Sequence, residues 1–403
     1  MAQRPRTQPR HRPIAADEVV EFVDDDSEQE PFPAGQLEQI HDAYLAASDW
    51  TTEVILSQLH RGNIDMRPSF QRRDAWRIGR KSLFIESVLL GFPIPQIVLA
   101  QAEGTRGSFI VLDGKQRLLA LMQFAGVAEG DNNAFALRGL RVRADLNGST
   151  FREIKESGAR DLAQFYNHTI RTVVIRNWPS HDFLHELFLR LNTGSVQLST
   201  QELRQAMFPG PFLEFLEDWT TKSKPLQALL RLKGPDFRMR DVEIAVRFLA
   251  FQTMASKYRG NLREFLDTAC RTLNANWDQL EKTIHRLLDE FEEGLTTAAV
   301  VFGQDTVARK WQGHSYQSRF NRAVFDVQLY YFADQEIREA SRKRASEVEA
   351  AFRKLCETDQ SFVTSVEATT KSISATQDRF LLWGRTLRRA TGVDFGFPQI
   401  AGD

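Results

Sequence analysis

A strand-to-helix junction at residues 108–124 is the feature that most constrains the fold. Ser108 to Leu112 is a short apolar run that is typical of a buried strand, and Asp113-Gly114 follows it directly. From Leu118 to Phe124 the apolar residues recur at helical spacing. A strand is therefore expected to end at Asp113-Gly114 and a helix to begin at Lys115, so this part of the chain combines both kinds of element.

The residue types at this junction are suited to bind an anion. Asp113 is expected to be the N-cap of the helix, because its carboxylate can accept from the first free backbone N–H groups. Gly114 permits a sharp turn, and Lys115 and Arg117 lie at the positive end of the helix. A phosphate there would meet backbone donors and an arginine fork. The alternative is a plain capped helix with two solvated cations, and the spacing alone favours that alternative.

The elements around the junction predict an α+β protein with a small mixed sheet. Gln96–Ala100 and Ser108–Leu112 are expected to form a hairpin, while Leu45–Gly62 and Arg80–Leu90 are expected to be helices. The pattern over 240–387 is also helical. We predict a disordered charged tail over 1–33, an α+β domain over 45–180 and a mainly helical domain over 181–390.

Composition excludes several classes of protein. Lysine and arginine (52) nearly cancel aspartate and glutamate (53), so bulk charge does not hold nucleic acid. Two cysteines cannot build a disulfide framework or a zinc cage. No apolar run reaches the roughly 18–20 residues of a membrane span, and no apolar segment follows the N-terminal arginines. A soluble cytoplasmic protein without a membrane partner is expected.

Positive charge is concentrated between residues 61 and 81, where cations outnumber carboxylates. Such a surface attracts polyanions even in a neutral protein. Trp76 in this stretch is suited to stack on a base or to anchor its loop, and the second role is the commoner one. The residues predicted to contact DNA are Arg73, Arg77, Arg80 and Lys81.

Taken together, these motifs resemble the GmrSD-type N-terminal domain, a prokaryotic family with a ParB/sulfiredoxin-like fold. Its members occur in modification-dependent restriction and other anti-phage systems. The resemblance is spread over roughly Asp49 to Leu387. The matching segments are Phe70-Gln71-Arg72 with Trp76, Ser82–Pro95, Val111–Leu121, Leu187–Arg204, Arg240–Ala250 and Asn321–Asp326.

The family's Asp-Gly-Gln-Gln-Arg signature is matched by Asp113, Gly114, Gln116 and Arg117, with Lys115 in place of the first Gln. In that family the motif is tied to nucleotide binding or hydrolysis that controls DNA cleavage. The resemblance therefore implies phosphate contact at Gly114. It also implies a catalytic role for four side chains, which are those of Asp113, Lys115, Gln116 and Arg117. Lysine adds a charge beside the phosphate, and it puts in doubt any role that needs the amide.

Two further family motifs imply contacts with the same pocket. Gln71 and Arg72 match a Phe-Gln-Arg motif and are implied to bind the nucleotide. Asn192 matches the family's Arg-Leu-Asn-x-Gly turn after a helix, where a ligand contact and a turn-forming role are equally good interpretations. The second interpretation arises because Ser199 and Glu202 form a capping box that opens the next helix.

Two functions remain open at this point. The first is a nucleoside triphosphatase that binds ATP or GTP at Asp113–Arg117, with Asp113 holding Mg²⁺ or orienting water, coupled to DNA in restriction or anti-phage defence. A variant of it cleaves a DNA phosphodiester. The second is a non-catalytic module that senses a nucleotide or modified DNA and works with a separate nuclease. The His-Asn-His nuclease domain of the restriction-type members has no counterpart here, which predicts a stand-alone member. No P-loop is present.

Two other polar groups need a role. His181 and His185 are four residues apart on a helix that Ser180 is expected to cap, which is half of a zinc site without a third ligand. Both are expected to be exposed. Glu86, within an apolar helix, is either a base near the pocket or the solvated edge of its helix.

Overall fold

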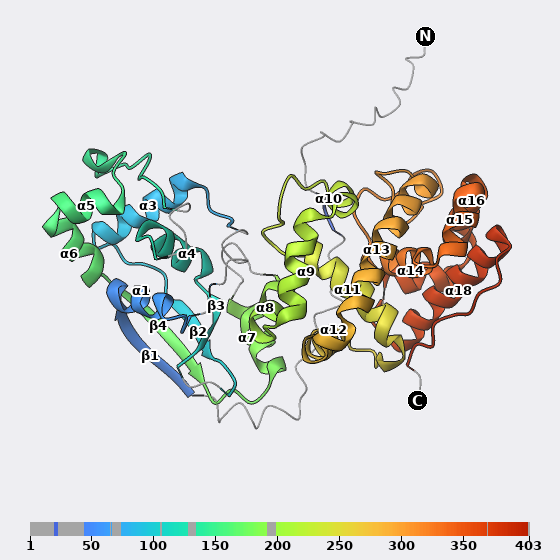
Figure 1. Cartoon of the computed structure of the whole chain (residues 1–403), viewed down its shortest axis with the longest axis horizontal. Coiled ribbons are helices and arrows are strands. Elements are labelled where there is room, and N and C mark those ends of the chain that lie inside the picture. Colours follow the sequence, from blue (N-terminus) through green and yellow to red (C-terminus); the bar gives the residue numbers. More distant parts are fainter. Residues whose placement is uncertain are drawn as a thin grey trace, which may run out of the picture. The chain divides into compact units, whose positions relative to one another are not determined.

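The computed structural model describes residues 20–22, 44–64, 66, 74–104, 107–127, 134–191, 199–368 and 370–401 (Figure 1). Contacts divide the chain into two compact units. We call them the sheet unit, with residues 26–222, 235–286 and 401–403, and the helical unit, with residues 1–25, 223–234 and 287–400.

Within the described residues, the sheet unit contains a four-stranded sheet in the order β1-β4-β2-β3. The predicted hairpin is confirmed, because β2 and β3 pair in antiparallel fashion. Strand β4 lies parallel to β2 and antiparallel to β1, which makes the sheet mixed, and the α+β fold class is also confirmed. The strands are β1 (Tyr44–Thr51), β2 (Ile97–Gln101), β3 (Phe109–Asp113) and β4 (Thr169–Arg176).

The helix predicted over Leu45–Gly62 is wrong in its first half. Tyr44–Thr51 is strand β1, and only Thr52–His60 is helical (α1). Strand β1 pairs with β4 along its whole length, from Tyr44 opposite Arg176 to Thr51 opposite Thr169. Thr51 then caps α1, because its side chain accepts from the backbone N–H of Val54. Pairing with a strand more than 100 residues away overrides the local helical preference of this segment.

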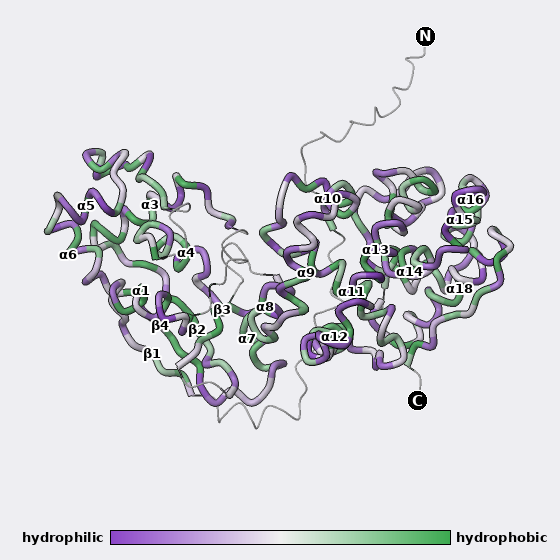
Figure 2. The backbone as a smooth tube through the Cα atoms, viewed as in Figure 1, coloured by the Kyte–Doolittle hydropathy of each residue, from purple (hydrophilic) through white to green (hydrophobic). Residues whose placement is uncertain are grey.

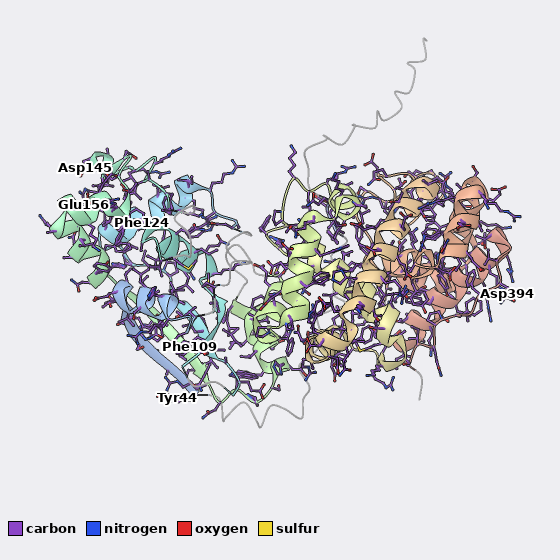
Figure 3. All side chains as sticks on the ribbon, in the orientation of Figure 1. Tyr44, Phe109, Phe124, Asp145, Glu156 and Asp394 are labelled. Atoms are coloured by element: carbon purple, nitrogen blue, oxygen red, sulfur yellow. The ribbon has the colours of Figure 1, made fainter. Side chains whose placement is uncertain are left out.

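Strand residues alternate between two hydrophobic layers, as the pleat of a sheet requires. Leu99 and Val111 pack with α1, α3, α4 and α6, whereas Val98 and Ile110 pack with α7 and α8. Figure 2 shows β3 among the hydrophobic stretches, and Figure 3 labels Phe109 of β3, which belongs to the first layer. The helices are α1 (Thr52–His60), α3 (Ile78–Leu89), α4 (Lys115–Phe124), α5 (Phe151–Ser157), α6 (Ala159–Asn167), α7 (His181–Leu191) and α8 (Thr200–Met207).

The remainder of the chain is helical, as the pattern over 240–387 predicts. In the helical unit, Trp383 packs against Phe352 with their ring centroids 5.2 Å apart. Among the described residues, no helix has both the length and the apolar character needed to cross a membrane. The sheet unit also contains α9 (Pro211–Lys222), α11 (Arg240–Met254), α12 (Leu262–Ala275) and the start of α13 (Trp277–Phe302); the helical unit contains the end of α13 with α10 (Lys224–Leu230), α14 (Arg322–Phe332), α15 (Gln335–Lys343), α16 (Ala345–Thr358), α17 (Gln360–Glu367) and α18 (Ile373–Thr391).

Most of the tail predicted over 1–33 lies outside the described residues, but Val20–Phe22 packs on the helical unit. The N–H of Phe320 donates to the carbonyl of Glu21 at 2.7 Å. The rings of Phe22 and Phe320 lie 4.7 Å apart, and the guanidinium of Arg322 lies over Phe22. This short segment is therefore an ordered part of the fold, although its neighbours in sequence are highly charged.

Candidate functional site

The turn between β3 and α4 is made by Gly114, which corrects the expectation that Asp113 caps the helix. Gly114 is the N-cap and has φ 101°, a left-handed conformation that favours glycine. A Cβ atom there would lie 3.0 Å from Cγ1 of Ile97 and 3.3 Å from Nη2 of Arg117. Asp113 instead accepts the N–H of Gly114 at 2.7 Å. Gly114 has no side chain with which to cap α4, and an α-helix leaves its first N–H groups without partners inside the helix.

Arg117 brings a buried guanidinium to this helix end. The residue is 9 % exposed. Its Nη2 donates to the carbonyl of Gln96 at 2.9 Å and to Oδ2 of Asp113 at 3.0 Å. Its Nε is buried and has no hydrogen-bond partner within the described part of the chain. The sequence correctly places a cation at this position.

Lys115 is not the solvated cation of the plain-helix alternative. Its Nζ lies 2.5 Å from Oε1 of Glu202 on α8, and the side chains are 3 % and 4 % exposed. Glu202 also completes the predicted capping box, because it accepts the N–H of Ser199 at 2.8 Å. Lys115 is therefore a buried cation balanced by a carboxylate that the sequence assigns only to helix capping.

A cavity of about 360 Å³ lies at the N-terminus of α4. Among the described residues that line it, the cationic side chains are Arg80, Lys115 and Arg117, and the carboxylates are Asp113 and Glu202. Aromatic and apolar side chains complete the wall, so the cavity combines a charged end with an aromatic surface. The apolar part is formed by Ala75, Trp76, Leu83, Phe84, Pro95 and Phe237.

A second cavity, of about 440 Å³, shares Lys115 and Glu202 with the first. Strand β3 contributes Phe109, Ile110 and Val111 to it, and Trp178 and His181 line it as well. The ion pair between Lys115 and Glu202 therefore borders both cavities.

Gln116 connects α4 to the loop before α3. Its Oε1 accepts the backbone N–H of Trp76 at 3.2 Å. The same N–H donates to Oδ1 of Asp74 at 3.0 Å. Gln116, which is predicted to be catalytic, thus makes a structural contact with Trp76, for which the sequence predicted either base stacking or anchoring of the loop.

The four residues predicted to bind DNA do not form one exposed surface. Arg77 and Arg80 are exposed. Lys81 is buried, and its Nζ contacts the carboxylate of Asp74 and donates to Gln123 at 2.6 Å. Charged stretches are usually solvated, but here the hydrogen-bonding partners needed to bury Lys81 come from two other elements. Arg73 lies outside the described residues, as do Gln71, Arg72 and Asn192.

Glu86 fits neither of the two roles left open by the sequence. It is buried, and its carboxylate accepts the N–H groups of Arg141, Val142 and Arg143 at 2.8 to 3.2 Å. Burial raises its pKa, but these hydrogen bonds outweigh burial and lower the pKa below its usual value. Glu86 therefore holds the loop after residue 140 in place.

The expectation that His181 and His185 are exposed is wrong for both, since His181 is half-buried and His185 is buried. Ser180 caps α7 as predicted, accepting the N–H of Phe183. His185 is buried, and burial holds its pKa well below the usual value. His181 lines the second cavity described above.

Magnesium fits this site only as a companion of phosphate. In the described ranges, no three His, Cys, Asp or Glu residues are grouped as metal ligands. Both oxygens of Asp113 are engaged by protein donors, Gly114 and Arg117. Mg²⁺ commonly binds through one or two carboxylates and the substrate's own phosphates. Asp113 can supply one such oxygen.

Sequence reasoning missed two residues of the site. Glu202 was visible only as a capping residue, and nothing in its spacing shows that it meets Lys115, 87 residues earlier. Phe237 carries no sequence signal, since it lines the cavity from a segment just before α11.

Comparison with known proteins agrees with the resemblance seen in the motifs. The family model described as "GmrSD restriction endonuclease, N-terminal domain" matches residues 53–209. No curated protein and no solved structure matches the chain. The matched region contains the junction, Gln116, Arg117 and Glu202. Over residues 53–209 the chain is therefore similar to the N-terminal domain of GmrSD restriction endonucleases, which indicates a restriction- or defence-related protein.

Proposed function

We propose that the cavity at the start of α4 binds a nucleoside triphosphate, ATP or GTP, with the phosphates at the helix N-terminus. The observation that carries the proposal is Arg117, which lines the cavity where α4 begins and whose buried Nε has no hydrogen-bond partner among the described residues. Helix N-termini attract anions through free N–H groups and the helix dipole, and an arginine fork binds phosphate oxygens in bidentate fashion.

The charges around Arg117 favour the same ligand. Three cationic side chains and two carboxylates face this cavity within the described residues, so its wall carries a net positive charge. Lys115 remains close to the phosphates, although Glu202 already balances it. The proposal thus gives Arg117 the direct contact and Lys115 a supporting electrostatic role.

Hydrolysis is the second part of the proposal. A water that attacks the terminal phosphate must be oriented by a hydrogen-bond acceptor, and charge that develops must be stabilised by cations. Asp113 is the carboxylate best placed to orient water, since Glu202 is buried against Lys115. Mg²⁺ would accompany the phosphates and supply charge neutralisation. We further propose that turnover serves DNA recognition, with cleavage by a separate nuclease.

One observation favours the alternative of a non-catalytic nucleotide- or modified-DNA-sensing module. Both carboxylates on the described wall are paired with cations, Asp113 with Arg117 at 3.0 Å and Glu202 with Lys115 at 2.5 Å. A carboxylate whose oxygens already accept hydrogen bonds from protein donors has less acceptor capacity left to orient a water.

The test measures binding of ATP and GTP by calorimetry and phosphate release with Mg²⁺, with and without duplex DNA. We expect wild type to bind and release phosphate, and Arg117→Lys to lose most of the binding because it keeps the charge but lacks the fork. The control is Arg152→Ala, which removes an exposed arginine of α5.

Each result decides a different point. Normal nucleotide binding by Arg117→Lys and by Arg117→Ala would refute the placement of the phosphates. Binding without release would select the sensing module. No binding by wild type under any condition would overturn the proposed function.

A further inference from the structure

A polar network anchors the segment that carries Trp76 into the wall of the 360 Å³ cavity at the start of α4, which we call the junction cavity. The carboxylate of Asp74 contacts Nζ of Lys81 and accepts from Nε2 of Gln123 at 3.1 Å. Lys81 donates to Oε1 of Gln123 at 2.6 Å, which closes the triangle. A buried charge that loses its partner is strongly destabilising, so each member holds the others in one arrangement.

This network fixes the backbone of Trp76. The N–H of Trp76 donates both to Asp74, at 3.0 Å, and to Gln116 on the first turn of α4, at 3.2 Å. Two separate elements thus fix the same backbone group at the cavity wall. Gln116 ties the aromatic residue directly to the helix end where the phosphates are placed.

An aromatic and cationic surface results on that wall. The Trp76 ring meets Phe84 edge-on, with centroids 5.8 Å apart and the planes at 66°. The guanidinium of the exposed Arg80 lies 4.6 Å from the Trp76 centroid. Both residues line the cavity. A planar guanidinium on an indole leaves flat surfaces suited to another planar ring.

We propose that Trp76 and Arg80 are the base-stacking platform of the junction cavity, and that Gln116 is its positioning residue. This inference rests on the proposed function, because it assigns the heterocyclic base of the same nucleotide. Stacking on aromatic rings and arginine planes tolerates every base, since each base has a π-face. The platform therefore selects for nucleotides against bare polyphosphates, and it discriminates little between ATP and GTP.

The test compares two probes by calorimetry in the presence of Mg²⁺: ATP, and inorganic tripolyphosphate, which has the phosphates without a base. We expect wild type to bind ATP at least about tenfold more tightly than tripolyphosphate. Arg80→Ala should weaken ATP binding more than tripolyphosphate binding, because it removes a stacking plane as well as a charge from the cavity wall. Trp76→Leu should weaken ATP binding about tenfold while leaving tripolyphosphate binding unchanged. Gln116→Met, which removes the bond to the Trp76 N–H, should give the same pattern to a smaller degree.

Arg77→Ala is the matched control, because Arg77 is an exposed neighbour outside the cavity wall. Arg80 is exposed, so its variant stays folded even if Trp76→Leu disturbs the packing against Phe84. Equal binding of both probes by wild type would refute the platform and leave the proposed function standing. An equal loss of both probes in Arg80→Ala and Trp76→Leu would also refute it. If wild type binds neither probe, both the function and the platform are overturned.

Discussion

The buried pair between Lys115 and Glu202 gives the sharpest prediction about stability. Glu202→Gln keeps the shape of the side chain and its ability to complete the capping box, since Gln serves there as well as Glu. It removes the only charge that Glu202 contributes. Lys115, 3 % exposed, then faces a neutral amide instead of a carboxylate at 2.5 Å.

The expected cost follows from burial at both ends of the pair. Breaking a buried ion pair by removing one partner typically costs about 3–5 kcal/mol, because the other charge stays buried after losing that counter-charge. Lys115→Gln, which introduces the glutamine of the family signature, should cost a similar amount. In the double variant neither member of this pair carries a charge, so the double variant should be more stable than either single variant.

The assay is native-state hydrogen exchange of α4 and α8 amides at increasing urea concentration, which reports the opening free energy of these helices separately from the helical unit. Glu156→Gln is the control, because Glu156 pairs with Arg152 on the surface, where the side chains are 62 % and 86 % exposed. It should change stability by at most about 1 kcal/mol. Single variants that cost no more than this control, or a double variant whose loss equals the sum of the single losses, would refute the reasoning.

Two further predictions concern titratable groups. Burial, assisted by Arg263 and Arg204, keeps the pKa of His185 well below its usual value of about 6.5, so the unfolded chain binds a proton that the folded chain rejects. Stability should therefore fall as the pH drops below about 6.5; melting curves of His185→Leu should show a shallower fall, and an unchanged slope would contradict this. Glu86→Gln should cost about 1–3 kcal/mol in urea unfolding at pH 7, because a charged acceptor of three N–H groups is lost. Since the pKa of Glu86 is lowered in the fold, this difference should shrink as the pH falls below about 4; a difference that persists at pH 3 would exclude the charge as its cause.

Local signals in the sequence predicted the part of the fold that holds the site. The hairpin of β2 and β3, the turn at Asp113-Gly114 and the helix that follows are all confirmed. Each depends on residues close in sequence, such as a glycine that tolerates φ 101° or apolar residues at helical spacing. The capping box of Ser199 and Glu202 is confirmed for the same reason.

Strand β1 shows where local reasoning fails. Tyr44–Thr51 contains residues that suit a helix, but it forms a strand because β4 offers it a complete ladder of backbone partners. Only the folded chain brings residues 44–51 and 169–176 together. Likewise, the order of the strands in the sheet depends on pairing between distant segments.

The sequence by itself determined which residue types surround the junction. It also determined that cationic side chains lie in the first turn of α4. The tertiary structure decided which of those charges are available. Lys81 and Lys115 are buried against carboxylates, and Glu86 binds backbone N–H groups. Arg117 lines a cavity, and its Nε has no hydrogen-bond partner within the part of the chain that the structure describes. Burial and pairing of a charge depend on what lies within a few ångströms of it, and those neighbours come from segments that only folding brings together.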